Sequence, residues 1–152
     1  MISRSLRGTR GLARSIGAQL RSRPGCVVAF VGELGSGKTT FVRAMAEGFG
    51  VVEPREVVSP TYALMNVHPG DALDLVHIDF YRLDDADHVV SLGLEEQLGR
   101  DDAVVAVEWA DKLPQLLPAN AAWITLEWRG PQARCITVRG IDKPRGVRLS
   151  RA

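Results

Sequence analysis

The chain has 152 residues, 45% of them hydrophobic, which suits one domain with a continuous core and excludes an array of several domains. No apolar run approaches the ~20 residues of a membrane-spanning helix, and the first residues lack the apolar block of a secretory signal, so we expect a cytoplasmic protein. The net charge of +1 hides basic ends and an acidic middle. Those ends could face RNA or an acidic partner, or they could be ordinary solvated faces.

The first predicted element is an amphipathic helix over residues 9–21, because apolar residues recur there every four positions. These residues are Leu12, Ile16 and Leu20. Pro24 and Gly25 end the helix. The arginine-rich segment before Thr9 does not show the pattern of a strand.

Residues 32–39 read Gly-Glu-Leu-Gly-Ser-Gly-Lys-Thr and fit the phosphate-binding loop pattern G-x-x-x-x-G-K-[ST]. Glycines permit the positive φ angles that turn successive backbone N–H groups toward a phosphate. Lys38 supplies a positive charge for the β and γ phosphates, and the Thr39 hydroxyl is placed to ligate magnesium. We expect a bound nucleoside triphosphate, and ATP is favoured over GTP because the chain lacks an Asn-Lys-x-Asp guanine signature.

The flanks of this loop support the same interpretation. An apolar, β-branched run over residues 26–31 predicts a buried parallel strand, and residues 40–49 predict a helix. Strand, loop and helix therefore stand in the order that a phosphate-binding loop needs, which an ordinary glycine turn need not show. Cys26 in that strand and Cys135 further along are expected to be buried free thiols.

The middle of the chain predicts a hairpin followed by short helices. Residues 62–67 and 73–80 read as antiparallel strands around a turn at residues 68–71. Residues 84–98 predict one or two short helices interrupted at Gly93. This hairpin would make an otherwise parallel sheet mixed.

The last predicted elements are a buried strand over residues 104–107 and a second hairpin made by residues 122–128 and 134–139. The order of elements predicts an α/β protein with the P-loop NTPase fold, a single three-layer domain with a mixed, mainly parallel sheet and a C-terminal β-hairpin. Residues 1–140 are expected to form this ATPase domain, and residues 141–152 a flexible basic tail.

Two acids each follow an apolar run: Asp79 and Glu108. A carboxylate at the end of a buried strand beside a phosphate-binding loop holds magnesium or orders water, and the sequence leaves open which of the two ligates the metal directly. Thr39 and Glu108 are both expected to lie outside the core. His77 is expected to be a packing residue, while Trp109 could pack beneath the site or stack on a base.

Five motifs in this order resemble the TsaE family, also called YjeE, over about residues 9–139. They are Gly-Glu-Leu-Gly-Ser-Gly-Lys-Thr-Thr-Phe from residue 32, Ser59-Pro60-Thr61-Tyr62, His77-Ile78-Asp79-Phe80-Tyr81-Arg82-Leu83, Leu92-Gly93-Leu94 and Glu108-Trp109. The resemblance implies a small bacterial ATPase that supports formation of threonylcarbamoyladenosine, the modified base beside the anticodon of tRNAs that read ANN codons.

The resemblance also implies partners and cofactors. In the family, TsaE docks on a complex of TsaB and TsaD, TsaD transfers the threonylcarbamoyl group, and ATP turnover resets the complex between cycles. We therefore expect TsaD and TsaB as partners, tRNA indirectly through that complex, and ATP or ADP with Mg²⁺ as cofactors. Hydrolysis should be slow alone and stimulated by the partner complex.

Roles for single residues come from the same resemblance. It implies phosphate contacts from Gly35, Ser36, Gly37, Lys38, Thr39 and Thr40, and magnesium contacts from Thr39 and Glu108. Asp79 would order water or the metal shell, so the implied catalytic residues are Lys38, Asp79 and Glu108. Thr9 and Arg134 match residues that approach the nucleotide, and residues 59–62 match the family's switch segment. Family members usually begin with a strand and an acidic helix start, from which this chain departs.

Two other functions share these motifs. A small-molecule kinase would need an acceptor site and usually an arginine-bearing lid, and the chain has no arginine cluster between its motifs. A nucleotide-dependent binding switch would use the loop without rapid turnover. If hydrolysis needs an arginine finger, Arg82 or a residue of TsaD could supply it.

Overall fold

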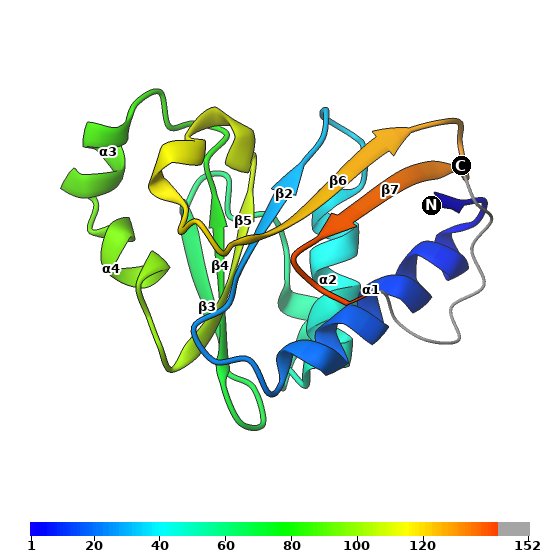
Figure 1. The fold of residues 1–152 in the computed structure, drawn as a ribbon, viewed down its shortest axis with the longest axis horizontal. Coiled ribbons are helices and arrows are strands. Elements are labelled where there is room, and N and C mark those ends of the chain that lie inside the picture. The colour runs from blue at the N-terminus through cyan, green and yellow to red at the C-terminus, as the bar shows by residue number, and fades with distance from the viewer. Residues whose placement is uncertain (143–152) are drawn as a thin grey trace.

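The computed structural model describes residues 1–142, and these residues contribute to one seven-stranded sheet with helices on both faces (Figure 1). The strands are β1 (Ile2–Ser3), β2 (Val27–Val31), β3 (Met65–His68), β4 (Asp74–Asp79), β5 (Ala103–Glu108), β6 (Ala122–Trp128) and β7 (Arg134–Arg139). The helices are α1 (Leu6–Leu20), α2 (Lys38–Phe49), α3 (Ala86–Ser91) and α4 (Leu94–Leu98). Short 3₁₀ turns occupy Pro54–Glu56, Ala110–Lys112 and Pro114–Leu116.

The sheet is mixed and its centre is parallel. Its strand order is β1-β7-β6-β2-β5-β4-β3. β2 pairs in parallel with both β5 and β6, and β4 pairs in parallel with β5. The hairpin partners β3 and β7 run antiparallel to their neighbours, and β1 pairs antiparallel with β7 at the edge. The predicted fold class, including the C-terminal hairpin, is confirmed.

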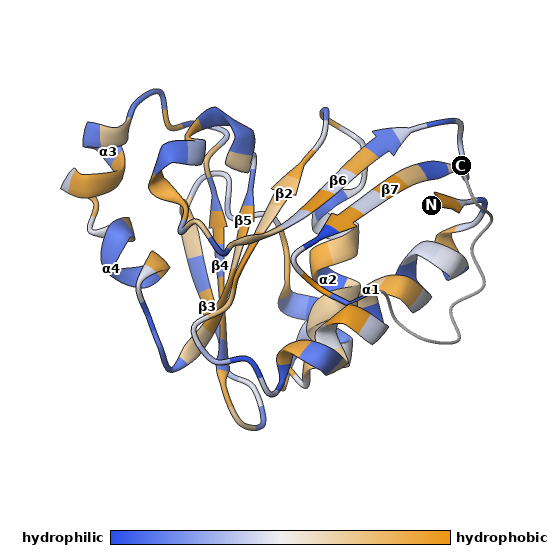
Figure 2. Ribbon diagram, viewed as in Figure 1, coloured by the Kyte–Doolittle hydropathy of each residue, from blue (hydrophilic) through white to orange (hydrophobic). Residues whose placement is uncertain are grey.

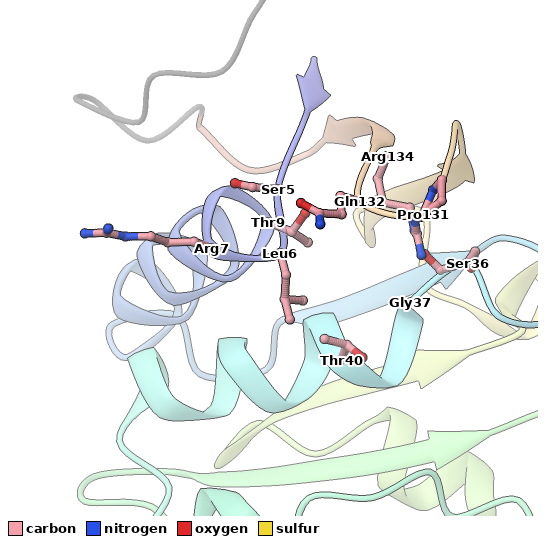
Figure 3. A pocket seen from close by; sticks show the side chains of 10 residues that line it. All are labelled: Ser5, Leu6, Arg7, Thr9, Ser36, Gly37, Thr40, Pro131, Gln132 and Arg134. Atoms are coloured by element: carbon pink, nitrogen blue, oxygen red, sulfur yellow. The ribbon is translucent and has the colours of Figure 1, made fainter.

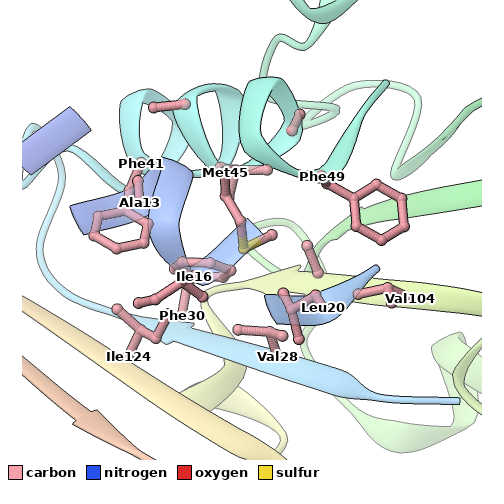
Figure 4. Close-up of a cluster of buried hydrophobic side chains, with 14 of the residues drawn as sticks. Ala13, Ile16, Leu20, Val28, Phe30, Phe41, Met45, Phe49, Val104 and Ile124 are labelled. Atoms are coloured by element: carbon pink, nitrogen blue, oxygen red, sulfur yellow. The ribbon is translucent and has the colours of Figure 1, made fainter. Parts of the chain in front are cut away.

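The three layers follow from the alternation of side chains along the strands. Even-numbered residues of β2, such as Phe30, face α1 and α2, while Val27 and Ala29 face the side that α3 and α4 cover. Figure 4 shows Ile16 and Leu20 of α1 and Met45 of α2 packed against β2. The central strands β2 and β5 are hydrophobic, whereas α4 is mainly hydrophilic (Figure 2). Burial on both faces explains the continuous apolar runs of these strands.

The N-terminus differs from the sequence prediction. Ile2 and Ser3 form an edge strand on β7, and α1 begins at Leu6, three residues before the predicted start. The Ser5 hydroxyl caps this helix by accepting a hydrogen bond from the Gly8 amide at 3.0 Å. The sequence did not show this strand, because two residues are too few to show a period of two.

The start of β3 also differs, since the chain turns over residues 61–63 and the strand begins only at Met65. The Leu64 amide donates to the Pro60 carbonyl at 2.5 Å, and Leu64 adopts a φ of 64°. Residues 62–64 therefore belong to this turn, although they were predicted to be part of the strand. The two short helices separated at Gly93 are as predicted, with Gly93 at a φ of 66°.

The end of the described chain packs against the core, because Ile141 is buried and belongs to the hydrophobic cluster that also contains residues of α1 and α2. Residues 143–152, which make up most of the predicted basic tail, lie outside the described residues. Cys26 and Cys135 are free thiols, as predicted, but both are half-buried rather than fully buried. Within residues 1–142, none of the helices is both long enough and apolar enough to cross a bilayer.

Helices α1 and α2 approach each other through two glycines. A Cβ at Gly17 would collide with the Met45 carbonyl oxygen and would lie 2.7 Å from the Phe49 amide nitrogen. A Cβ at Gly48 would collide with the Arg14 carbonyl in the same way. The absence of side chains here lets the two backbones touch, and this contact places α2 against the sheet.

Replacing Gly17 by alanine should therefore destabilise the fold by about 1–3 kcal/mol, because the helices must separate. Gly11 lies in the same helix with nothing within 4 Å of its would-be Cβ, so Gly11→Ala is the matched control and should stabilise by about 0.5–1 kcal/mol. Urea unfolding of the two variants measures both effects. Equal effects of the two substitutions would contradict the close helix contact.

Candidate nucleotide-binding site

The loop between β2 and α2 has the backbone that its glycines predict. Gly37, the residue before α2, adopts a φ of 103°, and Gly32 adopts a φ of 152°. A Cβ at Gly32 would lie 2.6 Å from the Ser36 hydroxyl, so the loop closes tightly on itself. The first amides of α2 have no partner within their own helix and carry the positive end of its dipole. This is the arrangement that binds phosphate.

Lys38 extends across this loop toward an aromatic ring. Its Nζ donates to the carbonyl oxygens of Gly32 at 2.5 Å and Glu33 at 3.1 Å, and it lies 3.7 Å from the centroid of the Trp109 ring. The Trp109 ring also packs on Tyr81, with the ring centroids 4.9 Å apart. These contacts hold the ammonium group at the floor of the loop, where phosphate oxygens could replace the two carbonyls as acceptors.

The charge of Lys38 is set by opposing effects. Burial lowers the pKa of its ammonium group, while the nearby carboxylates of Glu108, Asp79 and Asp111 raise that pKa, in this order of strength. Added negative charge from a phosphate would act in the same direction as these carboxylates. The lysine therefore sits where an anion stabilises its charged form.

Glu108 connects α2 to the centre of the sheet. Its Oε2 accepts a hydrogen bond from the Thr39 hydroxyl at 3.0 Å, and its Oε1 lies 2.9 Å from Nε2 of His77. Glu108 is only 2% exposed, so the expectation that it lies outside the core was wrong. The reason is that β5 is buried to its last residue, and Glu108 faces the same side as α2. His77 is fully buried, as expected of a packing residue, but it also makes this polar contact.

Asp79 stands beside Glu108 in the parallel register of β4 and β5. Its Oδ2 accepts hydrogen bonds from the hydroxyls of Ser59 at 2.6 Å and Thr61 at 2.7 Å, and its Oδ1 accepts from the Tyr81 amide at 2.8 Å. Ser59 and Thr61 line the cavity above the loop, whereas Asp79 lies behind them. In this structure Asp79 fixes the position of residues 59–62.

Two cavities meet at the loop. One, of about 450 Å³, is lined by Lys38, Thr39, Glu108 and Trp109 among others. The second, of about 490 Å³, lies between the start of α1, the start of α2 and the C-terminal hairpin (Figure 3). Both are lined by Gly37, Thr40 and Arg134. A long ligand could therefore occupy the two cavities with its charged part at the loop.

The two peripheral residues that the resemblance implied, Thr9 and Arg134, both line the second cavity. The Thr9 hydroxyl donates to the Ser3 hydroxyl at 2.9 Å. Arg134 donates from Nε to the Ser36 carbonyl at 2.6 Å and from Nη1 to the carbonyls of Gly130 and Ala133, each at 2.8 Å. Arg134 thus joins the hairpin loop to the phosphate-binding loop.

Sequence reasoning missed several residues of the second cavity. They are Ser5, Leu6, Arg7, Pro131 and Gln132. Ser5 could have indicated the first three of these residues, because serine is a typical N-cap and would start a helix at Leu6. The early start of α1 was not recognised from the sequence. The hairpin loop carried no signal, because its contact with the chain's N-terminal residues is a product of the sheet order alone.

The donors at the loop suit magnesium better than a transition metal. A hydroxyl and a carboxylate, those of Thr39 and Glu108, meet at the cavity wall, and both are oxygen ligands of the kind magnesium prefers. Among residues 1–142 no cluster of three or more histidine, cysteine, aspartate or glutamate side chains could hold a metal by itself. Magnesium usually takes one or two protein ligands and completes its shell with phosphate and water, so these residues fit it.

The fold and this loop define a protein of the P-loop NTPase class. The chain belongs to the TsaE family: residues 3–136 match the family model described as "Threonylcarbamoyl adenosine biosynthesis protein TsaE".

Relatives and a solved structure agree with this assignment. The chain is 43% identical to the tRNA threonylcarbamoyladenosine biosynthesis protein TsaE of Streptomyces coelicolor, over 88% of this chain and 91% of the relative. It is 36% identical to the TsaE protein of Bacillus subtilis, over 79% and 73% of the two chains. Its fold is similar to the crystal structure of YdiB from Bacillus subtilis, with a TM-score of 0.70, 28% identity, and coverage of 91% of this chain and 82% of that one.

Replacing Asp79 by asparagine should loosen the segment that it holds. The amide has one acceptor oxygen where the carboxylate has two, so it cannot serve Ser59, Thr61 and the Tyr81 amide equally well. We expect faster amide hydrogen exchange in residues 59–62 and a loss of about 1–3 kcal/mol in the free energy of unfolding. Asp74→Asn, at the other end of β4 and bonded to Arg100, is the control. Asp74→Asn should leave amide exchange in residues 59–62 unchanged. Equal effects of the two substitutions would contradict the role of Asp79 in holding these residues.

Proposed function

We propose that this protein is a magnesium-dependent ATPase that supports threonylcarbamoyladenosine modification of tRNA by acting on a TsaB–TsaD complex. The observation that carries the proposal is the meeting of Lys38, Thr39 and Glu108 at one cavity, with the Thr39 hydroxyl 3.0 Å from Glu108 Oε2. A cation, a metal-binding hydroxyl and a carboxylate at the start of a helix are the components of phosphoryl transfer to water.

The nucleotide would span the two cavities. Its phosphates would lie on the loop amides from Gly35 to Thr40, and its nucleoside would lie between α1 and the hairpin, near Thr9 and Arg134. Leu6 and Pro131 offer apolar surface for a base at that end. Arg134 lines both cavities, so it would sit where the nucleoside joins the phosphates.

Catalysis would be mainly positioning and charge stabilisation. Lys38 would leave the Gly32 and Glu33 carbonyls and donate to phosphate oxygens. Thr39 and Glu108 would hold magnesium, which, when bound, neutralises charge that develops on the phosphates. Asp79 would order the attacking water or the metal shell through Ser59 and Thr61, which line the cavity.

Slow intrinsic turnover is part of this proposal. The Arg82 guanidinium lies 5.1 Å from the centroid of the exposed Tyr62 ring, and Arg82 does not line the cavity that holds Lys38. For Arg82 to act as an arginine finger, residues 59–82 would therefore have to move, and a residue from TsaD could serve instead. Either source would couple hydrolysis to docking, so that ATP turnover resets the partner complex between cycles. Contact with tRNA would be indirect, through that complex.

A small-molecule kinase or a nucleotide-dependent binding switch remains the alternative. Both would bind ATP in the same cavity. A kinase would transfer the phosphate to an acceptor without needing the partner proteins, and a switch would bind partners without turnover. The response of hydrolysis to TsaB and TsaD separates these functions from the proposed one.

The test is ATP hydrolysis by the purified protein, alone and with TsaB and TsaD. We expect wild-type turnover to rise on addition of the partners, and Lys38→Ala to abolish it, because the γ-phosphate loses its main cation. Thr39→Ala should lower magnesium-dependent turnover at least tenfold, whereas the control Thr137→Ala, on the exposed face of β7, should leave it unchanged. A rate of ATP hydrolysis that does not change on addition of TsaB and TsaD would contradict the proposal. Hydrolysis that persists in Lys38→Ala would also contradict it.

Nucleotide should also stabilise the fold by mass action. At a hundredfold excess of ATP over its dissociation constant, the expected gain is about 2.7 kcal/mol in the free energy of unfolding. Thermal unfolding with and without ATP and magnesium measures this gain, and Lys38→Ala should reduce it. Absence of a thermal shift in the wild-type protein would exclude nucleotide binding at this site.

A further inference from the structure

His77 is a fully buried histidine in the middle of β4, below the nucleotide cavity. Alternation along β4 puts it on the same face as Leu75 and Asp79, toward α2. A polar ring in such a place needs a hydrogen bond to offset the loss of water. Its Nε2 lies 2.9 Å from Oε1 of Glu108, whose side chain is almost as deeply buried.

The contacts of the ring decide where its proton lies. An ionised carboxylate only accepts hydrogen bonds, so the nitrogen that faces Glu108 must be the donor. The other nitrogen, Nδ1, is buried and has no hydrogen-bond partner among residues 1–142. A buried N–H without an acceptor is rarer than a buried acceptor without a donor. Both arguments place the proton on Nε2 and leave Nδ1 as a bare lone pair.

We propose that His77 is a positioning residue for Glu108. The Nε2–H group holds Oε1 inside the protein, which fixes the rotation of the carboxylate and leaves Oε2 facing the Thr39 hydroxyl at the cavity. Thr39, Glu108 and His77 thus form a continuous chain from α2 through β5 to β4. The inference rests on the proposed function, because the orientation of Oε2 matters only if it faces a metal or its bound water.

The physical reason is the freedom of a carboxylate. Without a partner on Oε1, the group can rotate about its last torsion, whose energy wells are broad. Hydrogen bonds behind a metal ligand remove that freedom, and their loss typically lowers metal affinity or activity by about 10–100-fold. His77 therefore should act on magnesium and leave magnesium-free nucleotide binding nearly unchanged.

A second buried histidine supplies the control. His68 lies next to His77, with the ring centroids 6.4 Å apart, and its Nε2 is also buried without a partner among residues 1–142. Within residues 1–142, His68 makes no hydrogen bond or ion pair with Glu108. His68→Met and His77→Met therefore remove similar buried rings, but only the second removes the donor to Glu108. His77→Gln keeps a side-chain N–H group that can reach Oε1.

The experiment measures the dissociation constant of ATP by calorimetry, with magnesium and with a chelator, for the wild-type protein and these three variants. We expect magnesium to tighten ATP binding in the wild type and in His68→Met. His77→Met should lose about 10–100-fold of that enhancement while keeping the affinity for free ATP, and His77→Gln should recover most of it. The magnesium concentration for half-maximal hydrolysis should be similar in the wild type and His68→Met, higher in His77→Gln and highest in His77→Met.

The outcomes separate the inference from the proposed function. A wild-type protein that binds ATP with no response to magnesium would overturn both. A magnesium response that persists in His77→Met, or that is lost equally in His68→Met, would overturn the positioning role alone. If His77→Met does not fold, nitrogen NMR of the wild-type imidazole decides, because it needs no substitution. A proton on Nε2 whose nitrogen resonance shifts when magnesium is added to the ADP complex supports the role. A proton on Nδ1 alone, or an Nε2 resonance that magnesium leaves unchanged, overturns it.

Discussion

The parallel register of three neighbouring strands is the constraint on which the whole site depends. Phe30 of β2 pairs with Glu108 of β5, and Glu108 pairs with Asp79 of β4. Because the carboxyl ends of parallel strands meet at one edge of a sheet, the loop after β2 and both acids lie side by side. The contact between Thr39 and Glu108 follows from this register and from the close packing that seats α2 on the sheet.

Hydrogen bonds connect each wall of the site to that edge. Glu108 joins the start of α2 to β4 through Thr39 and His77, Asp79 holds residues 59–62, and Arg134 holds the hairpin to the loop. Tyr62, the last residue of that segment, is 88% exposed. A change in the bound phosphates could therefore alter the position of a surface residue through few contacts. This supports a function in which a partner protein senses the state of the nucleotide.

The sequence predicted the local structure well because its signals are local. The glycine pattern of residues 32–39, the apolar runs before Asp79 and Glu108, and the turn at Gly93 each depend on neighbouring residues. The predictions failed where distant contacts decide. Ile2 forms a strand because β7 lies beside it, and Glu108 is buried because residues of α2 and β4 pack against it. The second cavity joins the start of α1 to the C-terminal hairpin, and no local signal carries such a contact.

The most direct test of this account is a crystal structure of the protein with ADP, magnesium and a fluoride analogue of the transferred phosphate. We expect Lys38 Nζ to leave the carbonyls of Gly32 and Glu33 and to contact the phosphates. Magnesium should lie beside Thr39 and Glu108, and the nucleoside should lie between α1 and the hairpin. A nucleotide bound elsewhere, or one bound here with Lys38 still on those carbonyls and magnesium remote from Glu108, would contradict it.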